Sequence, residues 1–419
     1  MDFFNRYKKI FLVLGFVGVV IFIGYFLYSL FFKSTTPEGL EGDQNATSTG
    51  PGSGLPAANT GTGGQIIDNG GKTDGLSGAA TTSAGTAKQP DQIASGGVTK
   101  TETLTKTPSL GATISSDGNG LQYYDKNDGK FYRIDPAGNA KAISDKVFYK
   151  VDSVVWSPNK NQAVLEYPDG SNIIYDFNNQ KQITLPAHWK NFSYSPDGGN
   201  LVFKSMGQDP DNRWVATVSS DGSQVRGIEQ LGDKDDEVYT EWSPNNQVAA
   251  LYAEGKDFDR QEVYFIGLNG ENFKSTIVEG RGFDPKWSPQ GNQLVYSVYS
   301  SQTEMKPGLW VVDAQGDNIG SNRRNLNINT WAEKCNFSGG TNLFCAVPRE
   351  LDEGAGLFPE LAKNTVDDLY QIDSATGAKK RIAIPEGDYT IDNIMVSADQ
   401  KYLYFSDSAS GQLHKINLK

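Results

Sequence analysis

The chain has 419 residues, with 50 acidic and 38 basic side chains and a formal net charge of -12 at pH 7. This acidic balance argues against a nucleic-acid-binding surface, because polyanions are bound by clustered Lys and Arg. Only Arg323-Arg324 and Lys379-Lys380-Arg381 form basic runs late in the chain, and we interpret both as solvated loop or strand-edge charges.

Residues 10–32 are apolar, aromatic or glycine apart from Ser29, and they carry no charge. A run of this length crosses a bilayer with some tilt. Arg6, Lys8 and Lys9 precede it and acidic residues follow it, so the positive-inside rule predicts a cytoplasmic N-terminus. A long signal peptide is the alternative, although the run ends without a small-residue cleavage site. We therefore predict that residues 1–33 form a cytoplasmic N-terminus and a single transmembrane helix in the cell membrane, with the rest extracytoplasmic.

Residues 34–97 are dominated by Gly, Ser, Thr, Ala, Asn and Pro. Such a composition cannot bury enough apolar surface to offset chain entropy. We predict a disordered linker, and we favour a passive tether over a binding motif within it.

A short phrase recurs over residues 98–419, in which an aromatic residue, serine and often proline precede an apolar strand. The strong copies are Trp156-Ser157-Pro158, Tyr194-Ser195-Pro196, Trp242-Ser243-Pro244 and Trp287-Ser288-Pro289. Weaker copies contain Ser115, Ser338 and Ser397. Subtracting successive serine numbers gives steps of 42, 38, 48, 45, 50 and 59 residues. Four-stranded propeller blades have repeats of roughly 40–50 residues, so the pattern predicts an all-β, seven-bladed β-propeller of four-stranded blades.

The chemistry of the phrase favours a tight turn, because serine bonds nearby backbone groups and proline presets φ. We expect the aromatic residue to end the innermost strand and to wedge between neighbouring blades. A second phrase of alternating apolar residues, such as Leu309-Trp310-Val311-Val312-Asp313, predicts another half-buried strand in most repeats.

Together the two phrases resemble the TolB-type, WD-like β-propeller repeat, over about residues 98–419. The resemblance implies a propeller fold, but it does not imply one function, because this propeller is reused in binding proteins, peptidases and lyases.

The last repeat stops at Lys419 without room for a fourth strand. Residues 98–104 are rich in β-branched residues and precede the first repeat. We expect them to pair as the outermost strand of the last blade and to close the ring, which removes an exposed edge.

Cys335 and Cys345 are the only cysteines, and they lie five residues on either side of Gly340. A hairpin centred there places them opposite each other, and an extracytoplasmic location permits oxidation. We predict a Cys335–Cys345 disulfide, with two buried free thiols as the alternative.

The sequence offers little catalytic or metal-binding chemistry. His188 and His414 are the only histidines, and we expect no Ser-His-Asp site, no cofactor and no zinc site. Acidic loops containing Asp209, Asp235 and Asp257 could supply oxygen ligands to Ca²⁺, but we interpret them as solvated loop charges. We therefore assign no catalytic, cofactor-binding or metal-binding residue.

The longest repeat contains an insertion at residues 348–366, where apolar and acidic residues alternate. We expect a short helix after Phe358-Pro359. Leu357, Phe358 and Leu361 are our candidates for contact with a partner, and packing back onto a blade is the alternative.

These observations favour a binding scaffold in the cell envelope whose partner is an envelope protein, a peptide or a glycan. They favour a binding protein over an enzyme. The alternative is a glycan-active lyase or hydrolase that uses carboxylates, which can do such work without histidine. A structural spacer or wall sensor is a third possibility.

Overall fold

The computed structural model describes residues 19, 22 and 89–419 of the chain. The predicted transmembrane segment, residues 10–32, and most of the predicted linker, residues 34–97, lie outside the described residues. Within the described part, no helix combines the length and the apolar character needed to traverse a bilayer. The anchor and the localisation therefore stay predictions.

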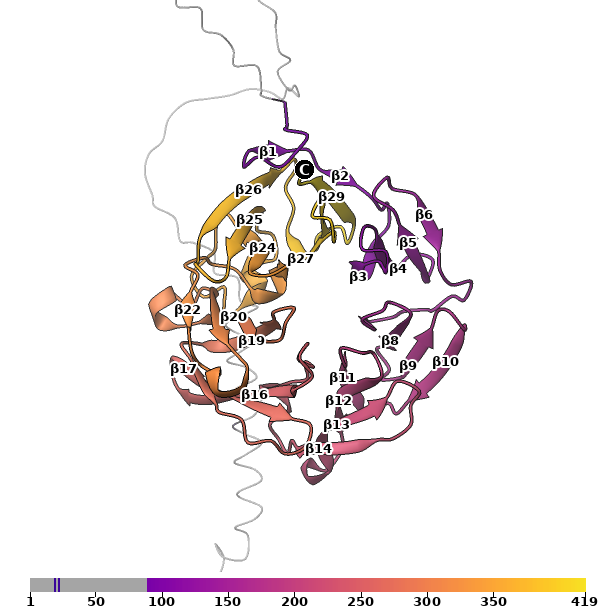
Figure 1. Ribbon diagram of the computed structural model, residues 1–419, viewed down its shortest axis with the longest axis vertical. Coiled ribbons are helices and arrows are strands. Elements are labelled where there is room, and N and C mark those ends of the chain that lie inside the picture. Colours follow the sequence, from indigo (N-terminus) through magenta and orange to yellow (C-terminus); the bar gives the residue numbers. More distant parts are fainter. Residues whose placement is uncertain (1–18, 20–21, 23–88) are drawn as a thin grey trace, which may run out of the picture. The chain divides into compact units, whose positions relative to one another are not determined.

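Residues 89–419 form seven antiparallel sheets arranged in a ring, which is a seven-bladed β-propeller as predicted (Figure 1). In each blade the first strand along the chain lies innermost. The second phrase of the sequence forms the third strand; for example, Leu309–Asp313 lies within β21.

The first three blades follow one another along the chain. The first consists of β3 (Ser109–Ile114), β4 (Leu121–Asp125), β5 (Lys130–Ile134) and β6 (Ala140–Ala142). The second consists of β7 (Ser153–Trp156), β8 (Gln162–Glu166), β9 (Asn172–Asp176) and β10 (Lys181–Leu185). The third consists of β11 (Trp189–Tyr194), β12 (Asn200–Met206), the 3-10 turn η1 (Pro210–Asn212), β13 (Arg213–Ser219) and β14 (Arg226–Gln230).

The remaining blades contain more 3-10 turns. The fourth consists of η2 (Asp235–Glu237), β15 (Val238–Tyr239), β16 (Val248–Asp257), β17 (Arg260–Gly267) and β18 (Thr276–Val278). The fifth consists of β19 (Arg281–Trp287), β20 (Gln293–Tyr299), η3 (Ser301–Thr303), β21 (Gly308–Asp313), η4 (Gly316–Asn318) and β22 (Arg324–Asn325). The sixth consists of η5 (Ala332–Lys334), β23 (Cys335–Phe337), β24 (Asn342–Pro348), η6 (Pro359–Ala362), β25 (Asp367–Asp373) and β26 (Lys379–Pro385). The seventh contains β27 (Ile391–Val396), β28 (Tyr402–Asp407) and β29 (Leu413–Asn417).

Antiparallel pairing sends the connections that follow the first and third strands of each blade to one face of the ring. We call this the turn face. Connections after the second and fourth strands lie on the other face, which we call the insertion face because residues 349–366 join β24 to β25 there.

The repeated serine fixes the turn between the first and second strands of a blade. The Oγ of Ser157, which is 1 % exposed, donates to Oδ1 of Asn159 (2.8 Å) and accepts from the backbone N–H of Gln162 (3.0 Å). A buried hydroxyl with both bonds made costs little to desolvate and holds the strand entry in place. In four other repeats the serine Oγ also accepts a hydrogen bond from the backbone N–H five residues later, at Ser195, Ser243, Ser288 and Ser397.

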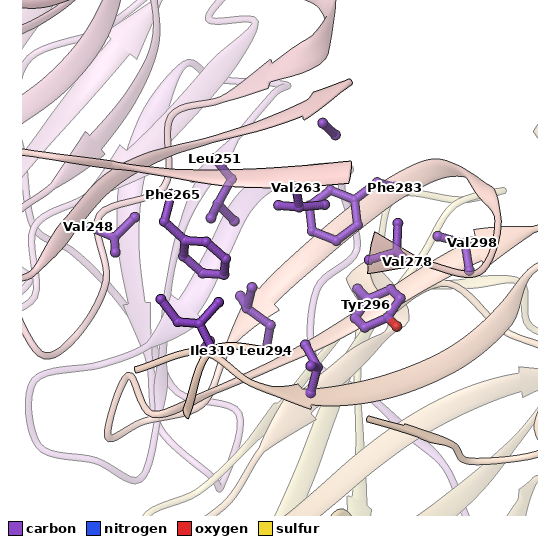
Figure 2. Close-up of a cluster of buried hydrophobic side chains, with 13 residues drawn as sticks. Val248, Leu251, Val263, Phe265, Val278, Phe283, Leu294, Tyr296, Val298 and Ile319 are labelled. Atoms are coloured by element: carbon purple, nitrogen blue, oxygen red, sulfur yellow. The ribbon is translucent and has the colours of Figure 1, made fainter. Parts of the chain in front are cut away.

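The hydrophobic core is divided among the contacts between blades. Seven clusters of buried apolar residues lie within residues 89–419, one between each pair of neighbouring blades. Between the fourth and fifth blades, Leu251 and Phe265 pack against Leu294 and Ile319 (Figure 2). Since both sides of a blade are covered, each strand buries apolar residues on two faces, and full burial of such a side chain contributes about 1.5–3 kcal/mol.

The predicted wedging of the aromatic residue is confirmed for all three tryptophans, which pack in the apolar clusters between neighbouring blades, and two of them also bond to the neighbouring blade. Nε1 of Trp156 donates to the carbonyl of Gly111 on the first blade (2.6 Å), and Nε1 of Trp287 donates to the carbonyl of Glu241 on the fourth (3.3 Å). Trp242 instead donates to Oδ1 of Asn246 in its own turn (2.8 Å).

Ring closure follows the prediction for residues 102–103 and differs from it for residues 98–99. β2 (Glu102–Thr103) pairs antiparallel with β29 as the outermost strand of the last blade. β1 (Val98–Thr99), however, pairs parallel with β26 of the sixth blade, so our assignment of all of residues 98–104 to the last blade was wrong. A single strand cannot follow two blades that diverge around a ring, so the chain pairs with each in turn.

The hydrogen-bonded part of the chain also begins before residue 98. The backbone N–H of Ala94 donates to the carbonyl of Asn417 (2.9 Å), and that of Gly96 donates to the carbonyl of Ile382 (2.7 Å). The last residues of the predicted linker therefore belong to the closing segment. We call residues 91–105 the clasp.

Cys335 and Cys345 face each other in register on β23 and β24, with Cα atoms 4.1 Å apart and sulfurs 2.07 Å apart. Both are 0 % exposed. Oxidation in the cell stays a prediction. We expect mass spectrometry to find both cysteines unmodified after alkylation of the unfolded but unreduced protein. Reduction of the disulfide should lower the free energy of unfolding by about 2–3 kcal/mol, because the bond closes a short loop. Two alkylated thiols would contradict the disulfide.

Candidate functional site

A cavity of about 670 Å³ lies against the innermost strands of the second to fifth blades. Its wall combines aromatic and charged side chains. The aromatic ones are Phe192, Tyr239, Trp242 and Trp287, and the charged ones are Glu166, Lys204, Asp236 and Glu241. We call this cavity the channel pocket. It reaches the insertion face, because Asp236 lies in the connection between the third and fourth blades.

Glu241 is the most perturbed acid of the channel pocket. Glu241 is half-buried and lines the cavity. Burial, together with the nearby Asp284 carboxylate and against the opposing effect of Lys286, raises the pKa of Glu241 to about 7. A carboxyl of this kind is partly protonated near neutral pH, so it can both donate and accept a hydrogen bond.

Two further charged groups of the pocket are held by backbone contacts. Nζ of Lys204, whose residue is 9 % exposed, donates to the carbonyl of Asp235 (2.6 Å). Burial lowers the pKa of Lys204, and burial raises the pKa of Glu166. Both groups are thus displaced toward their neutral forms, which makes the pocket responsive to the charge of a ligand.

The charged lining continues along the fifth blade. Oδ2 of Asp284 accepts from Oγ of Ser297 (3.1 Å) and from the backbone N–H of Glu333 (3.2 Å). Nζ of Lys286 donates to the carbonyl of Cys335 (2.5 Å). Burial raises the pKa of Asp284 and lowers that of Lys286. These contacts tie the fifth blade to the sixth through polar groups of the channel.

Beyond them, the sixth blade contains a buried ion pair. Nζ of Lys334 lies 3.0 and 2.9 Å from the two carboxylate oxygens of Asp367, which is 0 % exposed. Oδ2 of Asp367 also accepts from the backbone N–H of Ile391 (2.7 Å). Burial raises the pKa of the neighbouring Asp392 to about 6. Through its hydrogen bond to Ile391, Asp367 links β25 of the sixth blade to β27, the inner strand of the seventh.

Sequence reasoning did not identify the channel residues. A signal was present, because Glu241 and Lys286 immediately precede the tryptophan of their repeats, and Asp284 lies two residues before Lys286. Alternate residues of a strand share a face, so acidic and basic residues before the tryptophan could have been assigned to the channel.

The insertion places its candidate contact residues at the surface. Leu357, Phe358 and Leu361 are 45, 52 and 45 % exposed. The loop itself packs back onto the fifth blade, because the backbone N–H groups of Gly354 and Gly356 donate to the carbonyls of Glu304 (2.9 Å) and Met305 (2.7 Å). The expected helix is the 3-10 turn η6, within Pro359–Ala362. The loop backbone therefore packs back onto the blade, and partner contact through the three exposed side chains stays a prediction.

The histidines are separated by the fold. His414 is 3 % exposed, lies against the rings of Phe405 and Tyr389, and shares a hydrogen bond of 3.2 Å between Nδ1 and Oγ1 of Thr103. This is the structural position that we expected. His188 is exposed before β11. No group of three or more His, Cys, Asp or Glu side chains that could hold a metal ion occurs in the part of the chain that the structure describes.

The shifted acid of the channel pocket gives a testable dependence on pH. The folded protein binds the Glu241 proton more tightly than the unfolded chain, so stability is lost as pH rises from about 4.5 to about 7. The full shift corresponds to about 3 kcal/mol, and screening by water in the channel reduces it to about 1–2 kcal/mol. We expect Glu241→Gln to unfold like the wild type at pH 4 and to be more stable by that amount at pH 8.

Denaturant titrations at the two pH values measure this difference. Glu229→Gln, at an exposed position of β14, is the matched control. Equal stability of Glu241→Gln and the wild type at pH 8 would show that Glu241 carries no buried-charge penalty.

No protein-family model and no curated protein matches the chain. Oligogalacturonate lyase from Vibrio parahaemolyticus is similar in structure, with a TM-score of 0.50 and 10% identity over 76% of this chain and 93% of that chain. A chain in the mitotic checkpoint complex has a TM-score of 0.51 and 15% identity, over 82% of this chain and 99% of that chain. TolB from Acinetobacter baumannii has a TM-score of 0.40 and 12% identity, over 66% of each chain. Identities this low show a shared β-propeller fold alone.

Proposed function

We propose that the protein is a membrane-anchored binding scaffold of the cell envelope, held by residues 10–32, with its propeller on the extracytoplasmic side. The channel pocket receives a protruding group of an envelope protein, a peptide or a glycan. The observation that carries this proposal is the convergence of aromatic and acidic side chains from several blades on one cavity of about 670 Å³.

The chemistry of the pocket suits such a ligand. Aromatic faces stack on sugar rings or attract cations, and partly protonated carboxylates accept and donate hydrogen bonds to hydroxyl or ammonium groups. Trp287 and Glu241 lie side by side in the lining, joined by the bond from Nε1 to the Glu241 carbonyl. A ligand therefore meets an apolar surface and a polar group together, which is typical of small binding sites.

The exposed residues of the insertion extend the proposed surface. The channel pocket and residues 349–366 both reach the insertion face. A partner that covers this face can insert one group into the channel while it contacts Leu357, Phe358 and Leu361. Apolar contacts of this kind at an interface rim add area, whereas a buried central pocket supplies most of the affinity.

Crosslinking in the native cells, followed by capture of the full-length protein and mass spectrometry, tests the proposal. We expect one dominant partner or wall polymer with the wild type and with the Glu229→Gln control. The Glu166→Gln/Glu241→Gln variant should lose it, and Phe358→Ser should recover less of it. Equal capture by all four proteins, or no specific partner, would contradict a scaffold that binds through the channel.

A glycan-active lyase or hydrolase is the second candidate, favoured by the pKa of Glu241. An acid with a pKa of about 7 beside a second carboxylate, Asp284, has the properties of a general acid near neutral pH. A screen of polysaccharides decides this case. Activity that falls at least 100-fold in Glu241→Gln would establish the enzyme, and the same activity in both proteins would exclude Glu241 as its acid.

A further inference from the structure

A second cavity, of about 510 Å³, lies between the first and second blades, and its charge is opposite to that of the channel pocket. It is formed by turns of the turn face, including the repeat turn after β7. Its charged residues are Arg133, Lys141, Lys160 and Asp135. Three cations and one carboxylate give it a formal charge of +2, in a protein of net charge -12. We call it the basic pocket.

Lys160 holds an unfavourable backbone conformation at this site. It occupies the fourth position of a repeat turn with φ of 62°. Three sister turns have glycine there, namely Gly118, Gly198 and Gly291, with φ of 80°, 73° and 67°. Glycine takes positive φ without steric cost, whereas a residue with a Cβ does not. Two other turns have Asn246 and Gln400 there, with φ of 62° and 55°, so it is the surroundings of the Lys160 side chain, and not its φ, that point to a function.

The Lys160 ammonium has no protein partner in the described part of the chain. It forms no ion pair and donates no hydrogen bond there, since the Lys160 contacts are made by its backbone N–H and carbonyl. Burial lowers the pKa of Lys160. Lys160 is half-buried, and a partly desolvated cation without a counter-ion lowers stability, which an anionic ligand would offset.

Arg133 adds an unsatisfied donor to the same pocket. Its Nη2 donates to Oε1 of Gln122 (2.9 Å) and to Oγ of Ser116 (3.1 Å), but its buried Nε has no partner. Within residues 89–419, Arg133 forms no ion pair either. The Asp135 carboxylate is occupied, because it accepts from the backbone N–H (2.8 Å) and Nδ2 (2.9 Å) of Asn139.

The pocket also has donors for uncharged parts of a ligand. Gln122 is 0 % exposed. Its Nε2 donates to the carbonyl of Lys160 (3.3 Å) and its Oε1 accepts from Arg133, so it contacts both of these residues. The side chains of Asn161 and Asn178 line the cavity, and Phe177 forms an apolar wall. Amides bind hydroxyl groups well, and the volume matches a small ligand.

We propose that the basic pocket binds an anionic group, a carboxylate or a phosphate, between Lys160 and Arg133, with the surrounding amides holding hydroxyl groups of the same ligand. The site is independent of the channel pocket, because no residue lines both. It gives the protein a binding site for small acidic ligands on the face opposite the insertion.

Lys160→Gly is the informative variant, because glycine suits the positive φ and the change removes the unpaired charge. It should fold at least as well as the wild type. Lys150→Gly is the matched control, since Lys150 also has a positive φ of 57° but is exposed and does not line the pocket. Arg133→Met tests the second cation.

Calorimetry on the full-length protein should use inorganic phosphate, glucose 6-phosphate and glucuronate, with glucose as the uncharged comparison. We expect at least one anion to bind at millimolar concentration or below, and glucose not to bind. Lys160→Gly and Arg133→Met should each weaken the binding at least tenfold, and Lys150→Gly should not change it. Preference for a phosphate or for the carboxylate probe identifies the anionic group.

Three results would overturn the proposal. The first is that no anion binds at about 10 mM, a concentration at which a weak small-molecule site is expected to be occupied. The second is binding that Lys160→Gly leaves unchanged. The third is a lower melting temperature of unliganded Lys160→Gly than of the wild type, which would show that the ammonium stabilises the empty pocket instead of serving a ligand.

Discussion

Deletion of residues 98–104 is expected to lower the melting temperature of the propeller by about 5 °C. The clasp bonds two blades at once. The N–H of Leu104 donates to the carbonyl of Leu413 (2.8 Å), and the N–H of Glu386 donates to the carbonyl of Thr99 (2.9 Å). Each bond contributes about 1 kcal/mol net. With the burial of Thr99, which is 0 % exposed, we expect a total loss of about 3–5 kcal/mol, and this corresponds to the stated shift.

The deletion also exposes β26 and β29 as free edges, and such edges pair with other molecules. We therefore expect the shortened protein to aggregate in a concentration-dependent manner. Deletion of seven residues in the predicted linker, 61–67, is the control and should leave melting unchanged. Differential scanning calorimetry measures both proteins. A normal melting curve after deletion of residues 98–104 would show that the ring is stable without the clasp.

Replacement of Asp367 by alanine is expected to cost about 3–5 kcal/mol, because it leaves the buried Lys334 ammonium without its counter-ion. The change also removes the acceptor of the Ile391 N–H, so β25 of the sixth blade loses a hydrogen bond to β27 of the seventh. Urea unfolding of the full-length protein gives the difference. Lys256→Ala, which breaks a more exposed pair with Glu262 (3.0 Å), should change stability by less than about 1 kcal/mol.

The double variant Lys334→Met/Asp367→Leu separates the cost of an unpaired charge from the worth of the pair. Replacement of both charges by apolar groups of similar size is often close to neutral, so most of the loss should be recovered. If Asp367→Ala and the double variant are equally unstable, the hydrogen bond to Ile391 and local packing decide the stability here. If Asp367→Ala matches the wild type, the pair contributes nothing.

Local sequence determined the blades. The serine of each repeat turn bonds to groups within five residues, as Ser157 does with Asn159 and Gln162, so the turn is readable from a short stretch of chain. The spacing of these turns then gave the number of blades. The facing positions of Cys335 and Cys345 follow from the same kind of local reasoning, because a hairpin sets its own register.

Contacts between residues far apart in the sequence determined how neighbouring blades pair and pack. The clasp is divided between β26 and β29 because each edge offers only a short row of free backbone groups, and no pattern within residues 98–104 records this.

The sequence by itself thus determined a seven-bladed propeller and the turns that build it, since these depend on neighbours along the chain. Only the tertiary structure decided that Glu166 and Glu241 line one cavity, and that Arg133 and Lys160 line another. Those residues come from different blades, and the shift of a carboxyl or ammonium pKa depends on burial and on charges brought close by the closed ring. A linear pattern carries the period of the repeat, but it does not carry the electrostatic environment that the assembled blades create.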